Sequence, residues 1–244
     1  MKKIQWIIPL TISLFIFGVG SLEAAKYKVI KGGVKNGGMV SGSIILNPPP
    51  SAVKMLKVDK DTEICGGDRP SEELVVSEGG GVKNAVISIE GIKSGKKWGF
   101  PKKFVYDQKK CRFVPHLMLV KAKTKGTVLN SDNVGHNFHT VSKGIFSINK
   151  KIKANAKMVV KKNKIKRPGV VRVKCDLHSW MKGWWVVAET PYTVLSDENG
   201  NFSITDIPPG TYKLKVWQEK LGKTEQDIVI KAGETTKMDV ELSL

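Results

Sequence analysis

The chain has 244 residues, with 41 Lys and Arg against 22 Asp and Glu, so its formal net charge is +19. Hydrophobic residues make up 41% of the sequence, which is too many for a disordered chain and enough for a packed core. Three cysteines are too few for a small disulfide-dense scaffold, and four histidines exclude any site that needs a large cluster of imidazoles.

Residues 1–25 have the pattern of a secretory signal peptide. Lys2 and Lys3 precede an apolar run over 4–19, and small residues follow with a cleavage site after Ala24. The alternative is an uncleaved membrane anchor, although the run is near the short end for spanning a bilayer. We therefore expect a periplasmic or secreted protein with no stable membrane insertion after cleavage.

Residues 26–38 are rich in Lys and Gly and are expected to form a flexible arm. Beyond them helical periodicity is almost absent, and short β-branched and aromatic runs alternate with turn residues, as in a β-sandwich or barrel. The predicted strands are 39–46, 82–90, 116–122, 126–129, 137–141, 157–161, 170–175 and 184–188, then 202–204, 212–218, 227–230 and 237–242. The two groups of strands meet near 189–192, where the basic bias weakens.

Export places all three cysteines in an oxidising compartment, where at most two can pair within the chain. Cys175 belongs to a motif that gives it another role, so we expect Cys65 and Cys111 to form a disulfide. The alternative is that Cys65 and Cys111 remain buried free thiols.

The motif is Cys175-x-x-His178-x-x-Met181, which puts a thiolate, an imidazole and a thioether on one short loop after a predicted strand. Soft sulfur with imidazole favours copper. A second imidazole has to come from another strand, where His136 and His139 are available. Residues at i and i+3 of a strand point to opposite faces, so only one of the two can face the metal.

These two segments together resemble the cupredoxin (blue copper) family, and the short loop spacing is most similar to the amicyanin type. The resemblance implies one copper ion, Cu(I) or Cu(II), held by His136, Cys175, His178 and Met181. It also implies that Asn137 ties the two ligand loops together. In the family the downstream histidine exposes its ring edge through an apolar patch, which would place His178 and Trp180 at the surface that faces a partner.

Residues 190–244 resemble a carboxypeptidase-regulatory-like (transthyretin-like) β-sandwich, through Gly200-Asn201-Phe202 and the segment 207–212. Residues 40–110 resemble the leader of methylamine-utilisation-like periplasmic proteins. We therefore expect an all-β chain: a cupredoxin-like Greek-key β-sandwich over 39–190, including an N-terminal extension, followed by a small transthyretin-like β-sandwich over 191–244.

The histidine count separates the copper classes. A multicopper oxidase or a nitrite reductase needs more imidazoles than remain, and a dinuclear purple site needs two cysteines on the loop. A mononuclear site with four protein ligands has no open position for substrate, so we expect an electron carrier and no enzyme. The alternatives are a copper-binding or sensing module without redox shuttling and a metal-free structural β-sandwich.

Between residues 133 and 175 there are twelve basic residues and no acidic one. Such focused charge steers an acidic redox protein, for example a cytochrome or a periplasmic dehydrogenase, although a merely solvated basic face is an equal alternative. The residues predicted to face the partner are Trp180, Lys161, Lys162 and Lys164. Nucleic acid is not expected, because no aromatic residues interleave the lysines to stack on bases.

Overall fold

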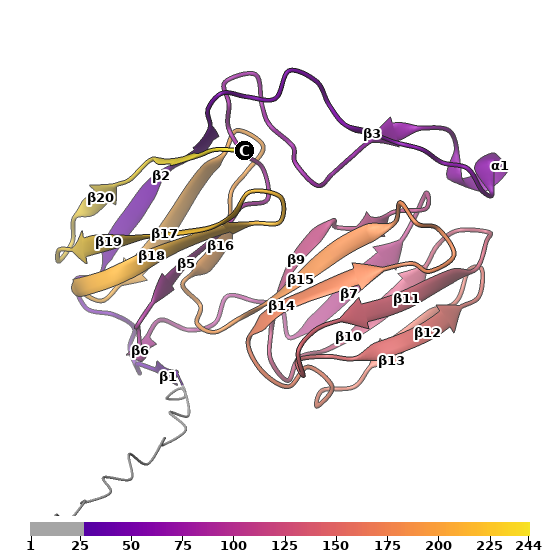
Figure 1. Cartoon of the computed structure of the whole chain (residues 1–244). Helices are drawn as coiled ribbons and strands as arrows, with labels where there is room; N and C mark the ends of the chain where they lie inside the picture. Colours follow the sequence, from indigo (N-terminus) through magenta and orange to yellow (C-terminus); the bar gives the residue numbers. More distant parts are fainter. Residues whose placement is uncertain (1–26) are drawn as a thin grey trace, which may run out of the picture.

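The computed structural model describes residues 27–244, so the predicted signal peptide over 1–25 lies outside the described residues. Within 27–244 helix occurs only as α1 (Thr62–Cys65), and no helix there is long and apolar enough to cross a membrane. The remaining elements are strands, and they build two β-sandwiches that lie side by side (Figure 1). The all-β prediction is confirmed.

The first unit, here called the central sandwich, spans residues 103–188 and has two sheets with the strand orders β13-β10-β7-β8 and β12-β11-β14-β15-β9. Neighbours pair antiparallel except β10 with β7 and β15 with β9, which run parallel. This crossed strand order is the cupredoxin-like Greek-key arrangement. The strands are β7 (Lys103–Gln108), β8 (Phe113–Val114), β9 (Leu117–Lys121), β10 (Lys125–Asn130), β11 (His136–Val141), β12 (Ile148–Ile152), β13 (Lys157–Val160), β14 (Gly169–Lys174) and β15 (Lys182–Ala188).

Alternation along these strands decides which side chains enter the core. In β14, Val171 and Val173 are fully buried while Arg172 between them is exposed. In β11, His136 is buried with every second residue after it, and His139 lies on the other face. Successive side chains of a strand alternate between its two faces, so two histidines three positions apart lie on opposite faces.

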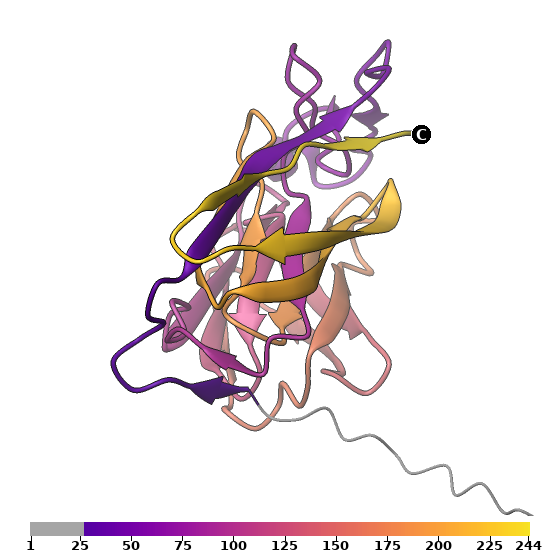
Figure 2. The ribbon, with the colours of Figure 1, turned by 90° about the vertical axis from the view of Figure 1, so that its left-hand side faces the viewer.

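The second unit, here called the terminal sandwich, has the strand orders β16-β5-β18-β19 and β17-β2-β20, with β21 also paired to β2. Figure 2 views the molecule from the side of this unit, with the central sandwich behind it. The strands are β2 (Gly38–Leu46), β5 (Val86–Glu90), β16 (Thr193–Leu195), β17 (Asn201–Ile207), β18 (Gly210–Gln218), β19 (Gly222–Ile230), β20 (Thr235–Lys237) and β21 (Val240–Leu242).

The predicted division into 39–190 and 191–244 is wrong, because β2 and β5 belong to the terminal sandwich. β5 lies between β16 and β18, and β2 pairs with β17, β20 and β21. Their inward residues Ile44, Ile87 and Ile89 are buried in the terminal core, which the strands after 191 cannot close alone. The central sandwich is therefore an insertion between β5 and β16.

The arm predicted over 26–38 is also ordered where it is described. β1 (Lys28–Val29) pairs in parallel with β6 (Ser94–Gly95), and the Tyr27 hydroxyl donates to the Lys96 carbonyl at 2.7 Å. Tyr27 packs edge-on against Trp98 and Tyr192, so these aromatic rings hold the arm against the terminal sandwich.

Between β2 and β5 the chain leaves the terminal sandwich and crosses the end of the central one, where Figure 1 shows β3 and α1. Residues 55–70 of this excursion, here called the strap, contain β3 (Met55–Leu56), α1 and β4 (Arg69–Pro70), with β3 and β4 paired antiparallel. Cys65 of the strap is bonded to Cys111 of the central sandwich, which confirms the predicted disulfide. Val58 and Cys65 are buried in the central core.

Candidate metal centre

Three of the predicted ligands meet at one end of the central sandwich. His136 begins β11 and Cys175 follows β14, and these two strands are antiparallel neighbours. His178 lies on the loop that joins β14 to β15. One donor atom from each of the three residues lies within 4.8 Å of the others, and all three side chains are buried.

The ligand loop is closed by its own backbone. The Cys175 N–H donates to the Met181 carbonyl at 3.1 Å, and the Met181 N–H donates to the His178 carbonyl at 3.0 Å. Met181 is buried in the central core beside Trp180. The indole N–H of Trp180 donates to the Cys111 carbonyl at 3.2 Å, and its ring lies 5.1 Å from the His178 ring. The loop that carries the sulfur and imidazole groups therefore has little conformational freedom.

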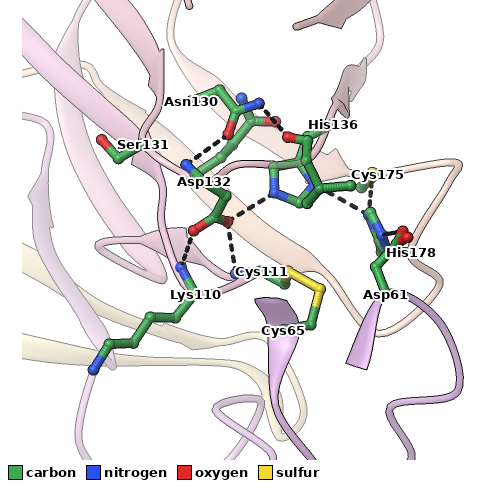
Figure 3. Close-up of polar contacts among 12 residues, drawn as sticks. Asp61, Cys65, Lys110, Cys111, Asn130, Ser131, Asp132, His136, Cys175 and His178 are labelled. Carbon is green, nitrogen blue, oxygen red and sulfur yellow. Dashed lines mark hydrogen bonds and ion pairs between the residues drawn. A yellow bond between two sulfur atoms is a disulfide. The ribbon is translucent and has the colours of Figure 1, made fainter. Parts of the chain in front are cut away.

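Each of the two candidate ligand histidines has a carboxylate on its Nε2 atom (Figure 3). The Nε2 of His136 lies 2.8 Å from Asp132, and the Nε2 of His178 lies 2.8 Å from Asp61 of the strap. A carboxylate only accepts hydrogen bonds, so both Nε2 atoms carry hydrogen and donate it. The two Nδ1 atoms then face each other at 3.0 Å, and the Cys175 sulfur lies 3.6 Å from the Nδ1 of His178.

Asp132 is itself held by the backbone. The N–H groups of Lys110 and Cys111 donate to its two oxygens at 2.6 and 2.8 Å. Burial alone would raise the pKa of this carboxyl, but the hydrogen bonds from His136 and from the two backbone groups outweigh burial and lower it. Asp132 is therefore a fixed anion behind His136, and its position depends on the turn that carries Cys111.

The same network perturbs the ligands. Burial opposes a charge on His136, but Asp132 and Cys175 outweigh it and raise the pKa of His136 to about 8. Burial would raise the pKa of the Cys175 thiol, yet the bonds from His136 and the backbone lower it. The pKa of His178 is lowered, chiefly by burial, against the opposing effect of Asp61. The raised pKa of His136 favours its protonated form, and a cation bound to the three donor atoms would compete with that proton.

The donor set fits copper. The Nε2–H groups of both histidines are bound to carboxylates, so both Nδ1 atoms are available to a metal ion. Together with the Cys175 thiol, whose pKa is lowered, they provide the two nitrogens and one thiolate of a trigonal copper site. Asn137 joins the two ligand segments: its N–H donates to the Cys175 sulfur at 3.2 Å, and its side-chain oxygen accepts from the Asp176 N–H at 3.2 Å. Both contacts correspond to the linking role expected of Asn137.

The expected exposure of His178 and Trp180 is wrong, whereas the role of Lys161, Lys162 and Lys164 toward a partner stays a prediction. His178 and Trp180 are buried, with 1% and 7% of their surfaces exposed, so no ring edge reaches solvent. Lys161, Lys162 and Lys164 are exposed, but they precede β14, whereas Cys175 follows it. At about 3.3 Å per residue, the strand separates these lysines from the site by roughly 20 Å.

Two residues of the site were not identified from the sequence. Asp132 lies four positions before His136, and this short spacing before a ligand histidine is a signal that sequence reasoning had available. Asp61 lies 117 positions from His178, and no spacing rule links it to the site. Only the fold of the strap brings Asp61 to the ligand loop.

Residues 181–243 match the family model described as the carboxypeptidase regulatory-like domain. This segment covers β15 to β21, so it contains most of the terminal sandwich but neither β2 nor β5. No curated protein matches the chain in sequence.

Among solved structures, part of the chain is similar to cupredoxins and to a copper-containing nitrite reductase. A copper-containing nitrite reductase from Thermus scotoductus SA-01 shares 16% identity over 42% of this chain and 25% of that chain, with a TM-score of 0.33. A purple cupredoxin from Nitrosopumilus maritimus shares 21% identity over 31% of this chain and 81% of its own, with a TM-score of 0.27. A methionine-to-alanine mutant of amicyanin in its Cu(I) form shares 19% identity over 42% of this chain and 98% of its own, with a TM-score of 0.31. With these low scores, the assignment of the fold rests on the strand order given above.

Proposed function

We propose that this chain is an exported mononuclear type 1 copper protein that transfers electrons and is not an enzyme. The observation that carries the proposal is the convergence of two imidazole Nδ1 atoms and the thiol of Cys175 in a buried cluster, with each Nε2 bound to a carboxylate. His136, Cys175, His178 and Met181 would hold the ion. Copper supplies a one-electron Cu(I)/Cu(II) couple there.

The chain's residues favour electron transfer over catalysis on a bound substrate. Disulfide, loop backbone and carboxylates restrain the ligand positions, so little rearrangement is needed when the charge of the site changes. The two remaining histidines are engaged elsewhere: His116 pairs with Glu219, and His139 pairs with Asp176. A second histidine site of the kind that a nitrite reductase requires is therefore not supported by their positions.

The test is the visible absorption of the purified protein after loading with Cu(II). A shuttle has an intense thiolate-to-copper band that bleaches on reduction and returns on oxidation. Cys175→Ser removes the thiolate, so we expect the band to vanish. Ser179→Ala, an exposed position on the same loop, is the matched control and keeps the band.

The outcomes separate the alternatives. Stoichiometric copper without a reversible band indicates a copper-holding module, and no bound copper indicates a structural β-sandwich. A strong band that survives Cys175→Ser overturns the ligand assignment.

We also propose an acidic redox partner. Exposed lysines also lie on β12, where Lys151 is paired with Asn137 and Lys150 with Phe138, and we propose Lys150 and Lys151 as part of the steering surface. Positive charge near the site raises the encounter rate with an anion, most strongly at low salt.

Hexacyanoferrate(III) is a suitable anionic probe of this charge. We expect neutralising Lys150 and Lys151 together to glutamine to slow oxidation of the copper-loaded protein several-fold at low ionic strength. The same change at Lys161 and Lys162, at the other end of β14, is the control with equal charge. Equal slowing by both pairs, or rates that ignore ionic strength, would contradict local steering.

A further inference from the structure

The strap is anchored to the central sandwich at several points around the candidate site. Its disulfide joins Cys65 to Cys111, the residue whose N–H holds Asp132. Arg69 of the strap donates to the carbonyls of Cys65 and Lys110, and its side chain is buried. Val58 packs in the central core, and its N–H donates to Asp68 at 2.9 Å. These contacts fix the loop between Val58 and Cys65 over the end of the sandwich.

Asp61 is the residue of that loop that reaches the ligands. Its carboxylate accepts from the Nε2 of His178 at 2.8 Å, and the His178 side chain is only 1% exposed whereas that of Asp61 is 33% exposed. The carboxylate therefore lies between the ring edge and solvent. Figure 3 shows Asp61 beside His178. Asp61 has φ of 49° and ψ of 38°, a left-handed conformation that Asp tolerates better than most residues.

We propose that the strap seals the outer edge of His178 and that Asp61 is the positioning residue that holds the ring with its Nδ1 toward Cys175. The position of Asp61 can be tested without copper. Its consequence for electron transfer rests on the proposed function. Binding the N–H of Nε2 selects the tautomer whose Nδ1 lone pair faces the site, and covering the ring edge removes the direct contact between His178 and a redox partner.

The first experiment uses the apo-protein and needs no copper. Nitrogen-15 NMR reports the tautomer of His178, and carbethoxylation by diethyl pyrocarbonate, followed by mass spectrometry, reports the access of reagent to its ring. In the unaltered protein we expect His178 to carry hydrogen on Nε2 and to react much more slowly than the part-exposed His139. His139 is thus an internal standard in every sample.

Asp61→Gly removes the carboxylate and keeps a residue that adopts the left-handed backbone freely. We expect His178 to lose its single tautomer. We also expect diethyl pyrocarbonate to modify it about tenfold faster, because local opening of the strap no longer has to break the charge-assisted hydrogen bond between His178 and residue 61. Asp61→Asn keeps an acceptor oxygen and should preserve the tautomer. Asp59→Gly, at an exposed strap position, controls for added chain flexibility and should leave both measurements unchanged.

The proposal is overturned if His178 of the unaltered apo-protein reacts as fast as His139, or if Asp59→Gly and Asp61→Gly have equal effects. After copper loading, Asp61→Gly should react faster with hexacyanoferrate(III) than the unaltered protein does, and an equal rate would refute the sealing role. Failure to bind copper would refute the proposed function while the apo-protein results still decide the role of Asp61.

Discussion

Asp132 accepts hydrogen bonds from three groups: the ring of His136 and the backbone N–H groups of Lys110 and Cys111. The histidine begins β11 and the two backbone groups belong to the disulfide turn, so one side chain sets the relative position of these segments. A carboxylate behind a ligand histidine also fixes the orientation of the ring and increases its basicity.

Asp132→Ala should therefore affect both stability and metal affinity. Two buried donors and one part-buried donor lose their acceptor, which we expect to lower the free energy of unfolding of the apo-protein by about 2–4 kcal/mol. Copper affinity should fall by about 10–100-fold. Denaturant titration and competition with a copper chelator measure the two effects. Asp107→Ala, which loses a single bond from the Ser131 hydroxyl, is the control and should change neither by a comparable amount.

At the scale of elements, β2 is a strand whose partners in the sheet lie far away from it in the sequence. It is predicted as a strand from its own residues, yet its partners β17, β20 and β21 are more than 150 positions away in sequence. Gly42 of β2 shows how closely these strands pack, because a Cβ atom there would lie 1.9 Å from the Met238 carbonyl oxygen.

Ile44→Ala tests the placement of β2 in the terminal sandwich. Ile44 is fully buried in that core, so the cavity should lower stability by about 2–5 kcal/mol. Hydrogen exchange should show the loss of amide protection in β17 and β18 rather than in β11 and β14. Val229→Ala on the exposed face of β19 is the control. Loss of protection that began in the central sandwich would contradict the assignment of β2.

At the scale of the whole molecule, a buried polar link joins the two sandwiches. Glu219, at the β18–β19 turn, accepts from the ring of His116 and from the indole N–H of Trp184, both in the central sandwich. The side chains of His116 and Glu219 are nearly inaccessible to solvent. An apolar cluster of Val86, Leu117 and Val186 lies at the same interface.

Glu219→Ala removes the acceptor for both central-sandwich groups. Breaking a buried pair costs about 3–5 kcal/mol, so we expect the coupling between the sandwiches to weaken and calorimetry to resolve two thermal transitions in place of one. Glu225→Ala on the same hairpin, where the partners Lys215 and Lys223 lie at 3.8 and 3.9 Å near the surface, is the control. A single unshifted transition in Glu219→Ala would show that the link does not couple the units.

The sequence alone determined the all-β class, the disulfide partners and the two segments that carry the candidate ligands. Alternation of apolar and polar residues shows directly which face of a strand is buried. A Cys-x-x-His-x-x-Met loop brings together the ligand types that copper prefers, a combination that few other structures require. The sequence nevertheless did not predict three strands of the central sandwich: β7, β12 and the two-residue β8. β7 alternates cleanly between buried and exposed residues, so its pattern was present, whereas β12 is a lysine-rich edge with little apolar signal.

Only the tertiary structure decided which strands share a sheet and what covers the candidate site. Strand pairing depends on complementary faces of segments far apart in the chain, and a local pattern contains no information about which distant face is available. For that reason the sequence predicts the wrong sandwich for β2 and β5 and an exposed position for the buried His178. The contact of Asp61 with His178 depends on the path of the strap, which the Cys65–Cys111 bond and the buried Val58 hold in place.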